Sequence, residues 1–293
     1  MSAPALAPQA APRSTEAPPV LLLCPPGNRV YQRDNYCSHE AKASYYWYPY
    51  DLVVQSGILE TVGPIEVLDA TALRLTPSQA LARIRGREFR AVLSLVGAVC
   101  WTEDVAFLRQ VAAETGAPLY LSGDVACAHP RQVLETLPFA SGVLMDYTSF
   151  DLATLLAGGA SGDVFLREAP VKRPHKNGPG PAFAFPIPRW ELFPKEHYRL
   201  PFLRQRPFAS VAASFGCPSK CGFCTAAPLV FRPRELDNLF EELRFLARSG
   251  YREIHFKDLS FAADPPYYAA LLERMIGERL GFTFSCLARA DEH

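Results

Sequence analysis

The stretch SFGCPSKCGFCTAAP, residues 214–228, places three cysteines in one short loop. Cys217, Cys221 and Cys224 have the spacing C-x3-C-x2-C, and Lys220 and Gly222 among them make the loop polar and flexible. Thiolates collected in such a loop bind a soft metal ion or an iron–sulfur cluster, because the bound cation lowers the pKa of each thiol. Three cysteines that merely pack in a core are disfavoured, since the loop is not apolar. The stretch therefore predicts a metal centre.

The number of thiolates separates zinc from an iron–sulfur cluster. Structural zinc is held by four ligands, usually in two pairs of short spacing, and this sequence has no second pair. Zinc would need Cys286 or His255 as a distant fourth ligand. A 4Fe-4S cluster held by three thiolates keeps one iron open for a small molecule. The cluster is favoured, and zinc stays as the alternative.

The residues around the loop predict alternating strands and helices. Three apolar strands and two amphipathic helices form the start of a (β/α) barrel or of an open parallel sheet. The expected strands are residues 210–215, 251–261 and 282–288, and the expected helices are residues 234–248 and 265–279.

The N-terminal part of the chain also alternates between apolar runs and helical patterns. Five short runs with flanking helices predict a doubly wound, flavodoxin-like parallel sheet, which binds ligands at the carboxyl ends of its strands. Thr76 and Thr102 suit helix N-caps, and Gly116 suits a C-terminal cap. The runs are residues 20–24, 65–70, 89–97, 117–123 and 141–147, and the helices are residues 51–60, 76–84, 102–116 and 129–137.

Composition limits the function classes. The 293 residues are 49% hydrophobic and 20% charged with zero formal net charge, which suits a globular protein of two domains. Zero net charge gives no general attraction to nucleic acid or to a membrane surface. No apolar run approaches the roughly 20 residues that span a bilayer. The other five cysteines are scattered singly, which favours a reducing cytoplasm.

The chain divides into four segments. Residues 1–19 are rich in alanine and proline and predict a disordered tail. Residues 20–157 form the α/β domain, and residues 209–293 form the part with the cysteine loop. Residues 158–208 predict an interdomain strap rich in proline and aromatic residues, with a floppy linker as the alternative. The aromatic residues expected to dock this strap are Phe183, Phe185, Trp190 and Phe193.

The sequence GCPSKCGFC at the end of a strand resembles the cluster motif of the radical S-adenosylmethionine (radical SAM) family. The resemblance implies that Cys217, Cys221 and Cys224 ligate a 4Fe-4S cluster whose open iron binds SAM. It also implies that Phe223 packs near the SAM adenine. Asp258 would accept hydrogen bonds from the SAM amino group, and Arg289 would contact its carboxylate. A loop or capping aspartate and an exposed arginine are the alternatives for the last two.

The N-terminal domain resembles the cobalamin-binding domain of one branch of that family, through LLLCPPG, YPYDLVV, EVLDA and P-x-P-x-W. This resemblance implies a cobalamin site. The motif D-x-H-x-x-G, which supplies a cobalt ligand in methionine-synthase-like proteins, is absent, and Asp34 to His39 has the wrong spacing. A degenerate domain without a cofactor therefore stays open. Residues at strand ends that suit the corrin or its tail are Pro25, Ser94, Gly97, Ser122 and Gly123.

The resemblance implies an enzyme that cleaves SAM reductively. The expected reaction is cobalamin-dependent methyl transfer, or radical rearrangement or cyclisation, in the biosynthesis of a cofactor or natural product. The alternatives are a radical SAM protein whose N-terminal domain is a scaffold, and an inactive iron–sulfur or zinc protein. The expected partners are a small-molecule substrate and an electron donor such as flavodoxin or ferredoxin. No sequence feature names the substrate.

The length of the barrel part departs from the family pattern. The barrel of the family has six strand-helix units, whereas the stretch from Val211 to His293 has room for three strands and two helices. A sheet that ends there would expose an apolar edge. We therefore expect a fragment of a longer enzyme, or a barrel completed by a second chain, and poor SAM turnover by this chain alone.

Overall fold

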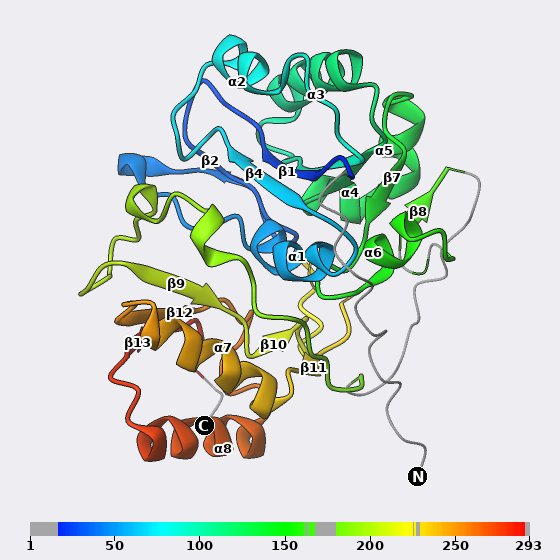
Figure 1. Ribbon diagram of the computed structural model, residues 1–293. Coiled ribbons are helices and arrows are strands. Elements are labelled where there is room, and N and C mark those ends of the chain that lie inside the picture. Colours follow the sequence, from blue (N-terminus) through cyan, green and yellow to red (C-terminus); the bar gives the residue numbers. More distant parts are fainter. Residues whose placement is uncertain are drawn as a thin grey trace.

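A computed structural model gives the fold of the chain. It describes residues 17–160, 162, 164–167, 180–224, 226 and 229–290. Most of the predicted tail and residues 168–179 of the predicted strap lie outside the described residues. An N-terminal α/β unit and a smaller C-terminal unit lie side by side, and the strap runs between them (Figure 1).

The N-terminal unit is built on a six-stranded sheet with the order β4-β1-β5-β6-β7-β8. The first five strands of this order pair in parallel, which confirms the predicted flavodoxin-like sheet. β8 pairs antiparallel with β7 and was not predicted. The strands are β1 (Val20–Cys24), β4 (Ile65–Asp69), β5 (Ala91–Leu95), β6 (Leu119–Ser122), β7 (Gly142–Leu144) and β8 (Val164–Leu166).

Helices cover both faces of this sheet. One apolar core joins the sheet to α2, α3, α4 and α5, and a second core joins its other face to α1, α6, the strap and the C-terminal unit. The two parts of the chain therefore share one continuous core. The helices are α1 (Tyr50–Glu60), α2 (Pro77–Ile84), α3 (Trp101–Thr115), α4 (Asp124–Ala128), α5 (Pro130–Thr136) and α6 (Asp151–Leu156).

Two of the three predicted cap residues lie at the helix ends of the structure. Thr76 caps α2 in a capping box, and Gly116 ends α3 with a φ of 60°. The prediction of Thr102 as an N-cap was wrong, because α3 begins at Trp101 and the Asp104 N–H donates to the Cys100 carbonyl. The short helices α4 and α6 were missed, since neither is long enough to show a helical period.

The C-terminal unit is the first part of a (β/α) barrel. Its parallel sheet has the order β13-β12-β9, and the unit's two helices lie close to it in Figure 1. This confirms the predicted partial barrel. The elements are β9 (Phe208–Val211), α7 (Leu236–Arg248), β12 (Glu253–Phe256), α8 (Pro265–Glu278) and β13 (Thr283–Ser285).

The strand predicted at residues 210–215 is interrupted. The Ala212 N–H donates to the Tyr50 hydroxyl at 2.7 Å, and the Ala213 N–H donates to the Asp258 carboxylate at 3.2 Å. These side chains take the amides that a continuous strand would offer to a neighbour. The chain then forms β10 (Ser214–Phe215), which pairs antiparallel with β11 (Arg232–Pro233) beyond the cysteine loop.

The strap is docked by buried aromatic side chains. Trp190 is 1% exposed, and its indole N–H donates to the Glu242 carboxylate of α7 at 2.9 Å. Glu242 also pairs with Arg234, and both of these side chains are fully buried. Gly57 of α1 lets the strap approach, because a Cβ there would lie 2.6 Å from the Pro186 carbonyl oxygen. The strap contains the 3-10 helices Trp190–Leu192 and Lys195–His197.

A long connection between β1 and α1 lies over the carboxyl edge of the N-terminal sheet. It contains β2 (Tyr31–Gln32) and β3 (His39–Glu40), which pair antiparallel, and the 3-10 helix Lys42–Ser44. Arg33 anchors it through a fully buried ion pair with Asp104 of α3, at 2.7 Å. Within the described part of the chain, no helix has the length and hydropathy of a membrane span.

Candidate functional site

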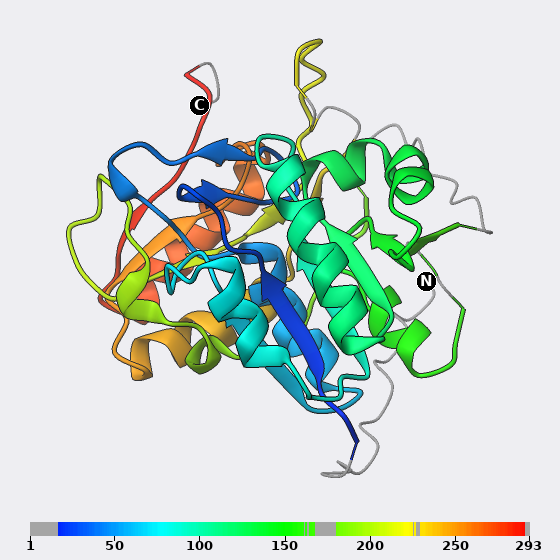
Figure 2. The same cartoon turned by 90° about the horizontal axis from the view of Figure 1, so that it is seen from above.

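The cysteine loop begins at a turn that requires glycine. Gly216 has a φ of 76°, and a Cβ at this position would lie 2.3 Å from the Val230 carbonyl oxygen. The turn brings the two ends of the loop together directly after β10. The loop then projects away from both sheets, as the yellow segment of Figure 2 shows. A site on this loop is therefore open to solvent and to a ligand.

The three thiols lie in the loop without converging. Cys217 and Cys221 are half-buried and Cys224 is exposed. The Cys224 N–H donates to the Cys221 carbonyl at 3.0 Å, which closes a tight turn around Phe223. Among the described residues, no group of three histidine, cysteine or acidic side chains is arranged to hold a metal ion. By its chemistry, this set of three thiols suits a 4Fe-4S cluster with three thiolate ligands.

Phe223 stands free of the protein core. Its side chain is 92% exposed, the largest exposure among the large hydrophobic residues identified as exposed. An aromatic ring held in solvent between two cysteines has no packing role. The predicted contact between this ring and the SAM adenine stays a prediction.

Asp258 holds the base of the loop. Its carboxylate accepts hydrogen bonds from the Ser214 hydroxyl at 2.6 Å, the Tyr268 hydroxyl at 3.0 Å and the Ala213 N–H. Burial raises the pKa of Asp258, while these donors oppose that rise. The side chain is 1% exposed. Because protein groups occupy this carboxylate, the geometry favours a role in positioning the loop. The predicted hydrogen bond from the SAM amino group to Asp258 stays a prediction.

Arg289 lies against the cysteine loop. Its guanidinium donates to the Ser219 hydroxyl at 3.2 Å and contacts the Cys221 sulfur at 3.8 Å. The chain after β13 therefore reaches the cysteine loop, and the predicted contact between Arg289 and the SAM carboxylate stays a prediction.

The connection after β1 supplies residues that the sequence analysis missed. Asp34 pairs with Lys257 at 2.8 Å, and the Tyr36 ring contacts Phe215 with the ring centroids 6.2 Å apart. In the sequence, Asp34 stands out only as the start of a D-x-H-x-x-G-like stretch with the wrong spacing. Because 223 positions separate Asp34 from Lys257, no local pattern could reveal the pairing.

Three of the positions predicted for cobalamin are packed against protein. A Cβ at Gly97 would lie 2.8 Å from the Ser38 Cβ, and one at Gly123 would lie 2.1 Å from the Val96 carbonyl oxygen. The Ser122 hydroxyl donates to the Asp51 carboxylate at 3.0 Å. These small residues therefore let the connection after β1 and the strand ends approach closely.

The other two predicted positions also have protein partners. The Ser94 hydroxyl donates to the Leu95 carbonyl at 3.1 Å, and the Pro25 carbonyl accepts from the Thr71 hydroxyl at 2.6 Å. Together with the contact between Gly97 and Ser38, these bonds show that protein groups, including part of residues 28–40, occupy the carboxyl edge of the sheet. In this arrangement the five residues do not form an open cradle for a corrin.

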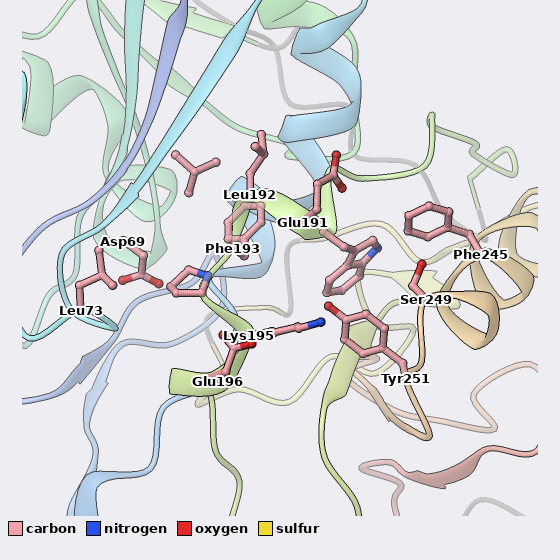
Figure 3. Close-up of a pocket in the computed structure, with 13 residues that line it drawn as sticks. Asp69, Leu73, Glu191, Leu192, Phe193, Lys195, Glu196, Phe245, Ser249 and Tyr251 are labelled. Carbon is pink, nitrogen blue, oxygen red and sulfur yellow. The ribbon is translucent and has the colours of Figure 1, made fainter.

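A cavity of about 400 Å³ lies between the strap, β4 and the end of α7 (Figure 3). Asp69 lines it, and its carboxylate accepts hydrogen bonds from the hydroxyls of Tyr46 and Tyr198. Burial raises the pKa of Asp69 to about 6. Ser249 and Tyr251 place the cavity at the amino end of β12, whereas Asp258 follows the carboxyl end. The cavity is therefore separate from the cysteine loop.

Comparison with known proteins gives matches that cover parts of longer chains. No protein-family model matches the sequence. The ribosomal protein uS12 methylthiotransferase RimO of Salinispora arenicola is 34% identical over 173 residues, which cover 49% of this chain and 34% of RimO. RimO of Salinispora tropica is 33% identical over 171 residues, with the same coverage. This chain spans about a third of the length of these relatives.

Solved structures share the fold over nearly the whole chain. The radical S-adenosylmethionine methyltransferase TsrM from Kitasatospora setae, with cobalamin and a [4Fe-4S] cluster bound, superposes with a TM-score of 0.60 and 20% identity. That match covers 90% of this chain and 52% of TsrM. The cobalamin-dependent S-adenosylmethionine radical enzyme OxsB superposes with a TM-score of 0.65 and 16% identity, over 94% of this chain and 39% of OxsB.

These structures agree with the two motifs that the sequence pointed to. The matches cover 90% and 94% of this chain, so they include its flavodoxin-like sheet and the strands and helices around its cysteine loop. The matched structures are radical SAM enzymes that carry cobalamin or depend on it. The chain therefore shares its fold with cobalamin-dependent radical SAM enzymes, and its described residues include three parallel strands that correspond to part of that fold.

Proposed function

We propose that this chain carries the cluster-binding part of a radical SAM enzyme. Cys217, Cys221 and Cys224 would hold a 4Fe-4S cluster through their thiolates. The observation that carries the proposal is the position of this loop, directly after the first strand of a radical SAM barrel fold. When bound, the cluster supplies the electron for reductive cleavage of SAM, at the iron that three thiolates leave open.

The residues around the loop would position and shield this chemistry. Asp258, Ser214 and Tyr268 fix the base of the loop through buried hydrogen bonds. Arg289 would place a positive charge beside Cys221 and the carboxylate of SAM. Phe223 would cover the adenine with the ring that now lies in solvent. The arrangement favours binding and orientation by protein groups, with the redox step supplied by the cofactor.

We further propose cobalamin-dependent methyl transfer to a small molecule as the reaction. The shared fold with TsrM, a radical SAM methyltransferase that binds cobalamin, supports this choice. A tryptophan substrate is bound in another TsrM structure. An external one-electron donor such as flavodoxin or ferredoxin would reduce the cluster. Because residues 28–40 cover the sheet edge, these residues would have to move for a corrin to bind there.

Anaerobic reconstitution with iron and sulfide tests the cluster. We expect about four iron and four sulfide per chain, together with the absorbance and the reduced-state EPR signal of a 4Fe-4S cluster. Cys224→Ala is expected to lose most of this iron, and Cys286→Ala, outside the loop, is expected to keep it. One bound zinc without sulfide would overturn the proposal.

A further inference from the structure

We propose that Lys257 is a positioning residue, which latches residues 34–38 of the N-terminal unit against the cysteine loop as a wall of the cluster site. The inference rests on the proposed function and extends it to residues outside the motif. It assigns a role to the five residues Asp34-Asn35-Tyr36-Cys37-Ser38, here called the wall segment.

Lys257 connects the barrel to the wall segment. It directly follows β12, and its N–H donates to the Val211 carbonyl at the end of β9, at 2.8 Å. Its ammonium group lies 2.8 Å from the Asp34 carboxylate and 4.9 Å from the centre of the Trp47 ring. The two charged side chains are only 14% and 5% exposed. An ion pair with so little solvent fixes geometry and is costly to break on one side.

Asp34 shapes the wall segment while it binds Lys257. Its other carboxylate oxygen accepts the N–H groups of Tyr36 and Cys37 at 2.9 and 2.8 Å. This local turn uses the aspartate side chain to hold the backbone. Burial alone would raise the pKa of Asp34, but the charge of Lys257 and these N–H groups lower it. Asp34 is therefore held charged between Lys257 and the turn.

The far side of the wall segment is anchored to the N-terminal unit. The N–H and hydroxyl of Ser38 both donate to the Asp124 carboxylate, at 2.7 and 2.8 Å. The Asn35 side-chain amide contacts the Cys127 sulfur at 2.9 Å. Because these partners belong to α4, the wall segment bridges the N-terminal sheet edge and the barrel.

The near side of the wall segment faces the cysteine loop. The Tyr36 ring packs on Phe215, two residues before Cys217, and its hydroxyl bonds the Tyr147 hydroxyl at 3.0 Å. Partial burial raises the pKa of the Cys37 thiol. The neighbouring charges of Asp34, Asp124 and Cys224 add to this rise, whereas the charge of Lys257 opposes it. Cys37 thus lies within electrostatic range of a predicted cluster ligand.

Two adjacent residues of one connection therefore organise the site from opposite sides. The Asp258 side chain holds the base of the cysteine loop, and the Lys257 side chain holds the wall segment. Adjacent residues of extended chain point to opposite sides, so the pair serves both tasks without a further element. The wall would exclude water from one side of the cluster and fix the loop relative to the N-terminal unit.

Asp34→Asn tests the latch, because it keeps the oxygen that shapes the turn and removes the charge that binds Lys257. Lys257→Met removes the other partner, and Lys257→Arg retains the charge. In the cluster-free chain we expect the backbone amides of residues 34–38 to exchange with deuterium about tenfold faster in the first two variants, as measured by peptide mass spectrometry. Lys257→Arg should stay near the wild-type rate. Arg244→Gln, which breaks the half-exposed pair with Glu278, is the matched control and should have no effect.

In the reconstituted chain, we expect the first two variants to keep their iron but to change the EPR spectrum recorded with SAM. Lys257→Arg should restore the wild-type spectrum. Wild-type rates of hydrogen exchange in residues 34–38 of both Asp34→Asn and Lys257→Met would overturn the latch. Absence of a cluster in the wild-type chain would instead overturn the proposed function, and the exchange rates would still decide the latch.

Discussion

The Asp258 carboxylate accepts a hydrogen bond from the Ser214 hydroxyl, with the two oxygens 2.6 Å apart. This bond joins the segment after β12 to the strand that enters the cysteine loop. Tyr268 of α8 donates to the same oxygen of this carboxylate. The cysteine loop itself is exposed, so its position depends on this buried base. Changes beneath the loop should therefore affect cluster binding without altering any cysteine.

Asp258→Asn should weaken both the fold and the cluster site. One carboxylate oxygen becomes an NH2 group, so either Ala213 or the Ser214 hydroxyl faces a donor instead of an acceptor. A buried hydrogen bond lost in this way costs about 1–3 kcal/mol. Urea unfolding measures this cost, and reconstitution should give lower iron content. Asp237→Asn is the control because that side chain is 89% exposed. Equal stability and iron content in both variants would contradict the assigned role.

Asp51 should make the stability of the protein depend on pH. Burial, with a contribution from Asp34, raises the pKa of Asp51 from 3.8 to about 7. The folded state therefore binds this proton more tightly than the unfolded state does. The resulting stabilisation is complete below about pH 3.8 and is lost as the pH rises through about 7. The loss has an upper limit of about 4 kcal/mol.

Asp51→Asn removes the titrating group and keeps an oxygen for the Ser122 hydroxyl. We expect the free energy of unfolding of the wild type to fall more between pH 5 and pH 8 than that of the variant. Urea titrations at several pH values measure both slopes. Identical slopes would show that Asp51 is not the group responsible.

Corrin binding should require movement of residues 28–40. Gly97 and Gly123 lie in contact with protein at the sheet edge, so a corrin cannot reach them in this arrangement. We expect hydroxocobalamin to bind only with faster hydrogen exchange in residues 28–40, as mass spectrometry would measure. Residues of the sheet interior provide the internal reference. Tight binding with unchanged exchange would place the corrin elsewhere.

Glu242→Gln should destabilise the protein strongly. The substitution leaves Arg234 as a fully buried charge without its carboxylate and weakens the acceptor for the Trp190 indole. Removal of one partner from a buried ion pair costs about 3–5 kcal/mol. Thermal or urea unfolding measures this cost. Glu278→Gln, in the half-exposed pair with Arg244, should cost about 1 kcal/mol or less.

The sequence predicted those elements whose signals are local. Apolar runs such as residues 20–24 located the parallel strands, and Thr76 and Gly116 marked helix ends. The antiparallel β8 was missed because three residues carry no period. The break after Val211 was missed because it depends on the hydroxyl of Tyr50, which is distant in sequence.

Within the candidate site, the sequence predicted only those residues that belong to a short motif. The cysteine spacing located the loop, and the resemblance singled out Arg289, whose guanidinium contacts the Cys221 sulfur. Asp258 was identified as a site residue, but the sequence could not show that its carboxylate is enclosed by Ser214 and Tyr268. Lys257 had no local signal, because its partner Asp34 belongs to the other unit of the chain.

The buried strap limits where the chain can be cut into separate pieces. Trp190 reaches Glu242 across the boundary between the two units, and the strap lies against α1 at Gly57. A separate C-terminal piece would expose the buried Arg234 and Glu242 side chains to water. A separate N-terminal piece would expose the apolar surface that the aromatic residues of the strap now cover. The two halves are therefore not interchangeable modules, and a chimera must exchange the strap together with α7.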